Sequence, residues 1–276
     1  MNQKNLSKTA LLLLASVFAF LFLIPLLFLF FTSFKGLSES IGSSNLLPSV
    51  WTIENYVSVI SDSANSPIFR WMGNTAMITV IATALVIVID CLAAYSLARL
   101  NLPGKKIIIK IIILIMSIPG IVTLFPAFYL FKQAGFINTY IPLILPYTAN
   151  VTGVFLIYNF LMDFPVSLEE AACVDGASTI RTFMSIVMPS LKPIILTLGL
   201  ITFLAVYNDY LWPSLVVTSG EMKTLTTGIA SLVLGSNFVN PGLMMAATLL
   251  AVLPALVLFL LLNKHLVRSN LNAGIK

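Results

Sequence analysis

The chain has 276 residues, of which 59% are hydrophobic and 9% charged, and its mean hydropathy is +1.02. A soluble domain carries about 25% charged residues, so a water-soluble globular protein is excluded. The formal net charge is +5 and the pI is near 9.2. We interpret this balance as basic loops on the cytoplasmic face of a membrane rather than as a surface that binds nucleic acid. Lipid is then a partner, and nucleic acid is not.

Six apolar runs are long enough to cross a bilayer, because about 20 helical residues span a hydrocarbon core of about 30 Å. In chain order, the predicted spans are 10–31, 71–97, 107–131, 141–162, 194–214 and 242–263. The first run is too long for the core of a signal peptide and has no cleavage site after it, so we keep it as a span. The sequence therefore predicts an all-α membrane protein with a single transmembrane domain over 1–276.

Basic residues predict the orientation of the spans. With a cytoplasmic N-terminus, four of the fifteen Lys and Arg residues lie outside: Lys35, Arg70, Lys132 and Lys223. The others lie inside: Lys4, Lys8, Arg99, Lys105, Lys106, Lys110, Arg181, Lys192, Lys264, Arg268 and Lys276. The positive-inside rule then predicts a multi-pass protein with both termini in the cytoplasm and a long cytoplasmic loop at 163–193.

Several residues within the spans interrupt their apolar character. Proline lacks a backbone N–H, so we expect kinks or breaks in the middle spans, where neighbouring groups can satisfy the freed carbonyls. The prolines concerned are Pro119, Pro126, Pro142 and Pro146. Acidic and amide side chains are costly in lipid and should face the bundle interior or water. These are Asp90, Asn150, Asn159, Asn208 and Asp209.

The outer end of the fifth span holds the candidate residues for a substrate pathway. Asn208, Asp209 and Tyr210 combine polar groups with an aromatic ring, which suits contact with a sugar or with a binding protein. An interface position that water already hydrates is the alternative. Tyr207 and Trp212 add aromatic surface. Since such residues also gather at membrane interfaces, we favour that position for Trp212.

The loop 163–193 is too charged to enter the bilayer and too apolar for a solvated linker. Ser167 and Glu170 have the spacing of a capping box, Gly176 can end that helix, and Ser178 or Thr179 can cap a second helix. We expect two short helices joined by a tight turn. Two helical faces are candidates for docking into a groove of another protein: Leu168, Ala171 and Ala172, and Phe183, Ile186 and Val187.

This loop resembles the EAA loop in permease subunits of binding-protein-dependent ABC importers, through Glu170-Ala171-Ala172, Asp175-Gly176-Ala177, Phe183, Ile186 and Met188-Pro189. The resemblance implies the type I importer permease architecture, with six transmembrane helices and a coupling helix between helices 4 and 5. It implies that the following residues dock onto a cytoplasmic ATPase: Glu170, Ala171, Ala172, Asp175, Gly176 and Ala177. Capping by Glu170 and a purely local turn at Gly176 are the alternatives.

Three further stretches are similar to the maltose-type carbohydrate permeases: PSVWTIENY (48–56), AYSLAR (94–99) and NDYLWP (208–213). Tyr207 and Met188 depart from that family, where tryptophan and leucine are usual. The resemblance implies a bacterial plasma-membrane importer of mono-, di- or oligosaccharides. Its partners would be a second permease, two copies of an ABC ATPase, and an extracytoplasmic solute-binding protein.

The chain lacks sequence signatures for chemistry of its own. It has no nucleotide-binding G-x-x-x-x-G-K-[ST] motif, so we expect ATP and Mg to be bound by the partner ATPase, with no cofactor in this chain. His265 is the only histidine, which argues against a histidine-based metal centre or a membrane metalloprotease. The sequence shows no cluster of nucleophile, base or metal ligands, so we do not expect an enzyme. The alternative function is an ion-coupled secondary carrier that uses Asp90 and Asp209 as its relay.

Overall fold

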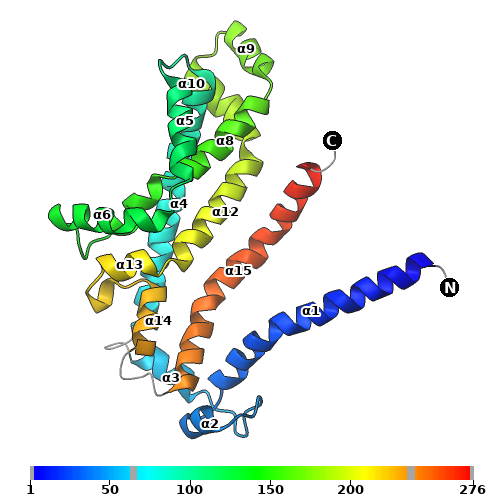
Figure 1. Cartoon of the computed structure of the whole chain (residues 1–276), viewed down its shortest axis with the longest axis vertical. Coiled ribbons are helices and arrows are strands. Elements are labelled where there is room, and N and C mark those ends of the chain that lie inside the picture. Colours follow the sequence, from blue (N-terminus) through cyan, green and yellow to red (C-terminus); the bar gives the residue numbers. More distant parts are fainter. Residues whose placement is uncertain (1–2, 63–66, 235–239, 274–276) are drawn as a thin grey trace. The chain divides into compact units, whose positions relative to one another are not determined.

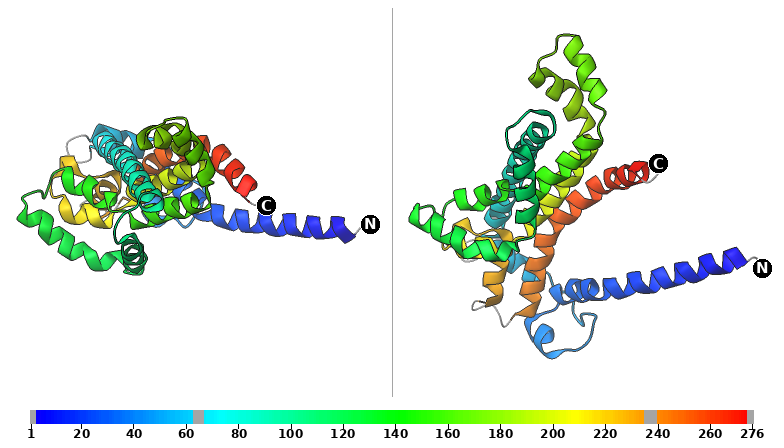
Figure 2. Two further views of the ribbon diagram at one scale, coloured as in Figure 1. Left: turned by 90° about the horizontal axis from the view of Figure 1, so that it is seen from above. Right: turned by 45° about the horizontal axis from the view of Figure 1, so that its top comes forward.

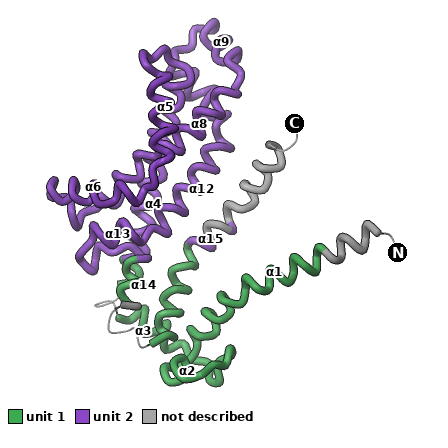
Figure 3. Tube along the Cα trace, viewed as in Figure 1, with its two compact units in different colours: residues 1–70, 227–254 green, residues 71–226, 255–276 purple. Residues whose placement is uncertain are grey.

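The computed structural model describes residues 3–62, 67–234 and 240–273, and its regular secondary structure there is helical throughout (Figure 1). The chain forms two compact units (Figure 3). Unit 1 holds Met1–Arg70 and Thr227–Pro254, and unit 2 holds Trp71–Thr226 and Ala255–Lys276. Several residues used in the sequence argument have side chains outside the described part: Lys4, Lys8, Lys264, His265, Arg268 and Lys276.

Unit 1 contains the N-terminal helix and the connection after it. Its elements are α1 (Gln3–Ser33), α2 (Leu37–Gly42), α3 (Glu54–Ser61), most of α14 (Leu225–Leu234) and the first part of α15 (Pro241–Ala273). The connection folds back onto the end of α1, because Asn55 Nδ2 donates to the carbonyls of Ser33 at 2.9 Å and Lys35 at 2.8 Å. Residues 34–61 are therefore an ordered part of this unit.

Unit 2 contains most of α4 (Ile68–Arg99) and the helices that pack along it (Figure 1). They are α5 (Lys105–Met116), α6 (Gly120–Gln133), α7 (Ile141–Ile144), the 3-10 turn η1 (Leu145–Thr148), α8 (Val151–Asp163), α12 (Lys192–Asn208) and α13 (Leu211–Val216). Between α8 and α12 lies a helix–turn–helix over residues 166–190. Helix α8 contacts both α5 and α12, so it lies inside the unit.

Three helices in the described residues are long and apolar enough to cross a membrane singly: Leu11–Ser33, Ile68–Arg99 and Ile141–Asp163. Two bent pairs raise the number to five if each pair is one span. The pairs are Lys105–Met116 with Gly120–Gln133, bent by 100°, and Thr179–Ser190 with Lys192–Asn208, bent by 74°. In α15, the stretch Pro241–Val257 is apolar, but this count does not cover the residues after it. Six spans with the bounds given above therefore stay a prediction.

Prolines interrupt the middle helices, as expected, at three of the four positions. Pro119 lies at the break between α5 and α6, whereas Pro126 lies inside α6. Pro142 and Pro146 stand in the first turns of α7 and η1. Because Pro146 has no N–H, the carbonyl of Pro142 has no helical donor, and Trp212 Nε1 donates to it at 2.6 Å.

Two clusters of buried side chains hold unit 2 together. The Tyr95 cluster joins α4, α8, α12 and the helix–turn–helix, through Cys91, Ala94, Tyr95, Ile157, Leu161, Phe183, Val187, Leu191 and Leu198. The Trp212 cluster joins α4 to α7, α12 and α13, through Ile78, Ala82, Leu143, Val206, Trp212, Val216 and Val217. These clusters lie at different levels of α4, and each supports one of the candidate sites.

Candidate functional site

The helix–turn–helix lies at the end of unit 2 where α4 ends (Figures 1 and 2). It consists of α9 (Val166–Val174), a turn, α10 (Thr179–Thr182), the π-helical turn η2 (Phe183–Val187) and α11 (Met188–Ser190). This is the predicted sequence of helix, tight turn and helix. The π-helical turn was not predicted.

Glycine makes the turn possible. Gly176 has φ +81°, a left-handed conformation that L side chains rarely adopt. The turn closes with hydrogen bonds from Gly176 N to Cys173 O at 3.0 Å and from Ala177 N to Ala172 O at 2.9 Å. This is a Schellman ending. Ser178 then caps α10 by accepting from Arg181 N at 3.4 Å, as predicted.

The predicted capping box at the start of α9 is wrong. The helix begins at Val166 with Pro165 as its N-cap residue, and no side chain caps it. Ser167 therefore stands inside the first turn, where its hydroxyl is not at the capping position. Pro165 has φ −59° and ψ 117°, so the chain enters α9 from a non-helical residue whose side chain has no oxygen to accept from the first-turn N–H groups.

The two predicted docking faces are corrected in part. Ala172, Phe183 and Val187 are buried, with Phe183 and Val187 packed into the Tyr95 cluster. They hold the helix–turn–helix onto unit 2. Leu168 and Ala171, from the first predicted face, are exposed. Three apolar residues outside both predicted faces are exposed as well: Val174 at 88%, Ile180 at 76% and Met184 at 60%. Periodicity identified the apolar faces but not which of them this chain covers itself.

The residues assigned to ATPase docking by resemblance lie close together around the turn. Glu170, Ala171, Asp175 and Gly176 are exposed, and Ala177 is half-buried. A cavity of about 220 Å³ lies between the arms, lined by Ala172, Asp175, Ala177, Arg181, Thr182, Ser185 and Ile186. The turn thus presents an acidic and small-residue surface beside the exposed apolar side chains.

An ion pair at the base of the helix–turn–helix was missed by the sequence reasoning. Arg99 Nε donates to Glu169 Oε1 at 2.6 Å, and both side chains are about one-tenth exposed, at 11% and 10%. Tyr95 donates to the other oxygen of Glu169 at 3.3 Å. The AYSLAR stretch offered one sign of this contact, because Tyr95 and Arg99 lie on the same face of a helix. Their partner Glu169 lies 70 residues after Arg99, and nothing in the sequence links the two.

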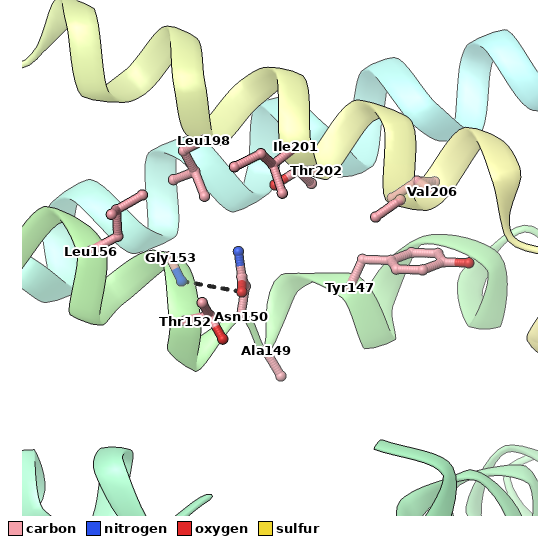
Figure 4. A pocket seen from close by; sticks show the side chains of 11 residues that line it. Tyr147, Ala149, Asn150, Thr152, Gly153, Leu156, Leu198, Ile201, Thr202 and Val206 are labelled. Atoms are coloured by element: carbon pink, nitrogen blue, oxygen red, sulfur yellow. Dashed lines mark hydrogen bonds between the residues drawn. The ribbon is translucent and has the colours of Figure 1, made fainter. Parts of the chain in front are cut away.

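A second candidate site is a cavity of about 370 Å³ between α12 and the segment from η1 to α8 (Figure 4). Its polar lining comes from Tyr147, Asn150, Thr152 and Thr202. The apolar lining comes from Leu156, Leu198, Ile201, Ala205 and Val206. Asn150 also caps α8 by accepting from Gly153 N at 3.2 Å. Polar groups on an otherwise apolar wall suit a ligand with several hydroxyl groups.

Of the predicted pathway residues, only Asp209 connects to this cavity. Its Oδ2 accepts from the hydroxyl of Tyr147 at 2.7 Å, and its Oδ1 accepts from Trp212 N at 3.4 Å. Asn208 is exposed and donates to Leu204 O in its own helix. Tyr210 is 43% exposed and does not line the cavity.

Trp212 is buried in unit 2, whereas a residue of an aromatic belt at the membrane surface, as predicted, would be exposed. It is 7% exposed and packs in the core of unit 2 beside Phe131, with ring centroids 5.9 Å apart. The carbonyl that Pro146 frees gives its indole N–H a buried acceptor. A tryptophan with its polar group satisfied in this way needs no contact with water.

Asp90 faces the bundle interior, as predicted for an acidic residue in a span. It is fully buried, and neither carboxylate oxygen has a hydrogen-bond partner in the described part of the chain. The side chain lies against Gly153, where an added Cβ would come within 1.9 Å of Oδ2. Asn159, in contrast, is exposed.

Comparison with known proteins gives the family. Residues 90–271 match the family described as binding-protein-dependent transport system inner membrane component. The diacetylchitobiose uptake system permease protein NgcG of Streptomyces coelicolor is 30% identical over 263 residues, covering 94% of this chain and 85% of the relative. The chain belongs to this family. It is therefore a multi-pass inner-membrane permease, and the predicted resemblance is confirmed.

Other comparisons extend over nearly the whole permease. The melibiose/raffinose/stachyose import permease protein MelC of Bacillus subtilis is 33% identical, covering 96% of this chain and 95% of MelC. A chain in the crystal structure of a bacterial ABC transporter involved in the import of alginate matches with a TM-score of 0.82 at 20% identity. The match covers 96% of this chain and 98% of that chain, so the two share a fold.

Proposed function

We propose that this permease is one of two transmembrane subunits of an ATP-driven importer for an oligosaccharide. Its other partners are two copies of a cytoplasmic ABC ATPase, which bind ATP and Mg, and an extracytoplasmic solute-binding protein. In this arrangement the chain has six spans and cytoplasmic termini, and its helix–turn–helix faces the cytoplasm. The chain itself contributes part of the translocation pathway and no catalytic residue.

One observation carries the coupling part of this proposal. Val174 and Ile180 are among the most exposed apolar side chains of the permease, yet they lie outside its predicted spans. In the proposed topology these side chains face the cytoplasm and not lipid, and exposed apolar residues next to water typically mark a protein interface. The acidic residues Glu170 and Asp175 belong to the same helix–turn–helix and are also exposed. We assign this surface to the ATPase.

The sugar part of the proposal draws on the relatives and on the cavity. NgcG and MelC are named for the uptake of diacetylchitobiose and of melibiose, raffinose and stachyose, which are all oligosaccharides. The cavity beside α12 offers Asn150, Thr152 and Thr202 as hydrogen-bonding groups for sugar hydroxyls. Asp209 connects to the Tyr147 end of this cavity, and we keep its exposed neighbours Asn208 and Tyr210 as proposed pathway residues.

The ion-coupled alternative has no support beyond its two acidic residues. Asp209 already accepts hydrogen bonds within the permease, and Asp90 lies behind Gly153 of the cavity wall without lining the cavity itself. The two accounts predict different responses to a protonophore. Uptake that stops when the protonophore is added at constant ATP would favour the carrier.

The decisive experiment reconstitutes the permease with its three kinds of partner in proteoliposomes. We expect ligand-stimulated ATP hydrolysis in the complete assembly and none with the permease alone. The double variant Val174→Ser with Ile180→Ser should reduce both copurification of the ATPase and stimulated hydrolysis. Val50→Ser, at a position 72% exposed in unit 1, is the matched control and should reduce neither. Stimulated hydrolysis that survives the double variant and a deletion of 168–188 would contradict the docking assignment.

A further inference from the structure

Three contacts tie the last turn of α4 to the base of the helix–turn–helix. Arg99 Nε donates to Glu169 Oε1 at 2.6 Å, and Arg99 Nη2 donates to Phe164 O at 3.0 Å. Tyr95, one helical turn earlier, donates its hydroxyl to Glu169 Oε2 at 3.3 Å. One guanidinium thus holds both the residue that ends α8 and a side chain in the first turn of α9.

These contacts are sheltered enough to act as a mechanical connection. An exposed ion pair contributes little and is easily broken, but Arg99 and Glu169 are only 11% and 10% exposed. A guanidinium presents several donors in a fixed planar arrangement, so its two bonds restrain direction as well as distance. The carboxylate also lies near the N-terminus of α9, where the helix dipole favours a negative charge.

The second arm is fixed to the same turn of α4. The ring of Tyr95 packs against Phe183 in η2, with ring centroids 4.8 Å apart. Phe183 and Val187 are buried in the Tyr95 cluster. Both arms of the helix–turn–helix therefore meet one short segment of α4, Tyr95–Arg99, by polar contacts from α9 and by apolar contacts from η2.

We propose that Arg99 and Glu169, supported by Tyr95, are positioning residues that make α4 move together with the helix–turn–helix. When the ATPase displaces the turn, the ion pair passes that displacement to α4 and so to the helices around the cavity. The inference rests on the proposed function. These residues have a different role from the docking residues. Arg99 and Glu169 are largely buried within this chain, and they connect α4 to the helix–turn–helix that carries the docking surface.

The test measures the number of sugar molecules imported per ATP hydrolysed by the complete importer. Arg99→Ala and Glu169→Gln should each lower this ratio several-fold, while the ATPase still copurifies. Arg99→Lys keeps a positive charge but loses the planar double contact, so its ratio should lie between those of Arg99→Ala and the wild type. Asp163→Asn removes an exposed carboxylate nearby and is the matched control, with no expected change.

Rescue separates a positioning role from a merely structural one. The exchanged pair Arg99→Glu with Glu169→Arg should recover part of the ratio that each single change loses. Reduced assembly with an unchanged ratio in the remaining complexes would overturn the proposal, as would loss of ATPase copurification by Glu169→Gln. Glu169→Gln keeps the side-chain shape, so it decides the matter if Arg99→Ala fails to assemble. If the wild-type assembly shows no ligand-stimulated hydrolysis, the proposed function fails and not this inference.

Discussion

The two ends of unit 2 differ in how their polar and apolar side chains are covered. At the end near Trp212, polar groups are paired inside the chain: Trp212 with the Pro142 carbonyl, and Asp209 with Tyr147. At the end with the helix–turn–helix, the chain pairs Arg99 with Glu169 but leaves Val174 and Ile180 exposed. The first end is held together by polar pairs within the chain, whereas we propose that a partner covers the exposed apolar residues of the second.

Two motifs that both resemble the carbohydrate permease family therefore have different structural roles. The NDYLWP stretch looks like a pathway motif because it concentrates polar and aromatic residues, yet Asp209 and Trp212 hold helix ends together. The EAA-like stretch is simpler in composition, and its side chains around Gly176 remain uncovered. We therefore expect substitutions at the Trp212 end to act mainly on folding and those at the turn to act mainly on coupling.

The largest effect is expected for Trp212→Ala. Truncating a buried aromatic side chain costs about 3–5 kcal/mol of unfolding free energy, and this change also removes the donor to Pro142 O. Thermal unfolding of the purified permease in detergent measures the loss. Trp51→Ala is the control, because Trp51 is 57% exposed and should cost clearly less. Equal stability of the two variants would break the contrast between the ends.

A smaller effect is expected for Asp209→Ala. The change leaves the Tyr147 hydroxyl and Trp212 N without their acceptor, and a buried polar group that loses its partner costs about 1–3 kcal/mol. Asp209→Asn keeps an acceptor and should cost less. Asn208→Ala is the neighbouring control, since its amide bonds only within α12. A change in the KM of transport with unchanged thermal stability would show that Asp209 serves the pathway and not the fold.

Much of the fold was predictable from local signals. The length of an apolar run indicates a membrane helix, and a proline indicates a break because it lacks a backbone N–H donor. Pro119 separates α5 from α6, and Pro146 frees the carbonyl that Trp212 satisfies. The sequence did not reveal that Trp212 was the donor. Indole groups are common at membrane interfaces, and only the tertiary contact across 70 residues distinguishes a buried one.

The helix–turn–helix was predictable in outline for local reasons. Gly176 supplies the left-handed residue, and Ser178 caps the next helix, so both signals act within a few residues. The exposed face was not predictable. Periodicity places Phe183 and Val187 on one face of a helix, but their burial depends on α4 and α8, which are distant in sequence. Glu169 was overlooked for the same reason, because its partner lies on α4.

Gly176→Val is expected to have the smallest effect on stability. Its main effect should be on the coupling of ATP hydrolysis to transport. An added Cβ would meet no atom within 4 Å, so the cost comes from the φ of +81° and amounts to about 1–2 kcal/mol. The strained turn should tilt α9 and its exposed residues away from their docking position. Transport by the reconstituted importer should therefore fall more than the amount of permease in the membrane does.

Gly176→Asn is the control at the same position, because asparagine tolerates a left-handed conformation better than valine. It should retain most of the transport that valine removes. If transport and membrane abundance fall together for valine, the glycine serves only the folding of the turn. An added Cβ at Gly176 meets no atom of this chain within 4 Å, so a loss of coupling at constant abundance comes from the direction of the turn or from a clash with the docked ATPase. Asparagine is of similar size and would clash as well, so full transport by Gly176→Asn assigns the valine effect to the direction of the turn.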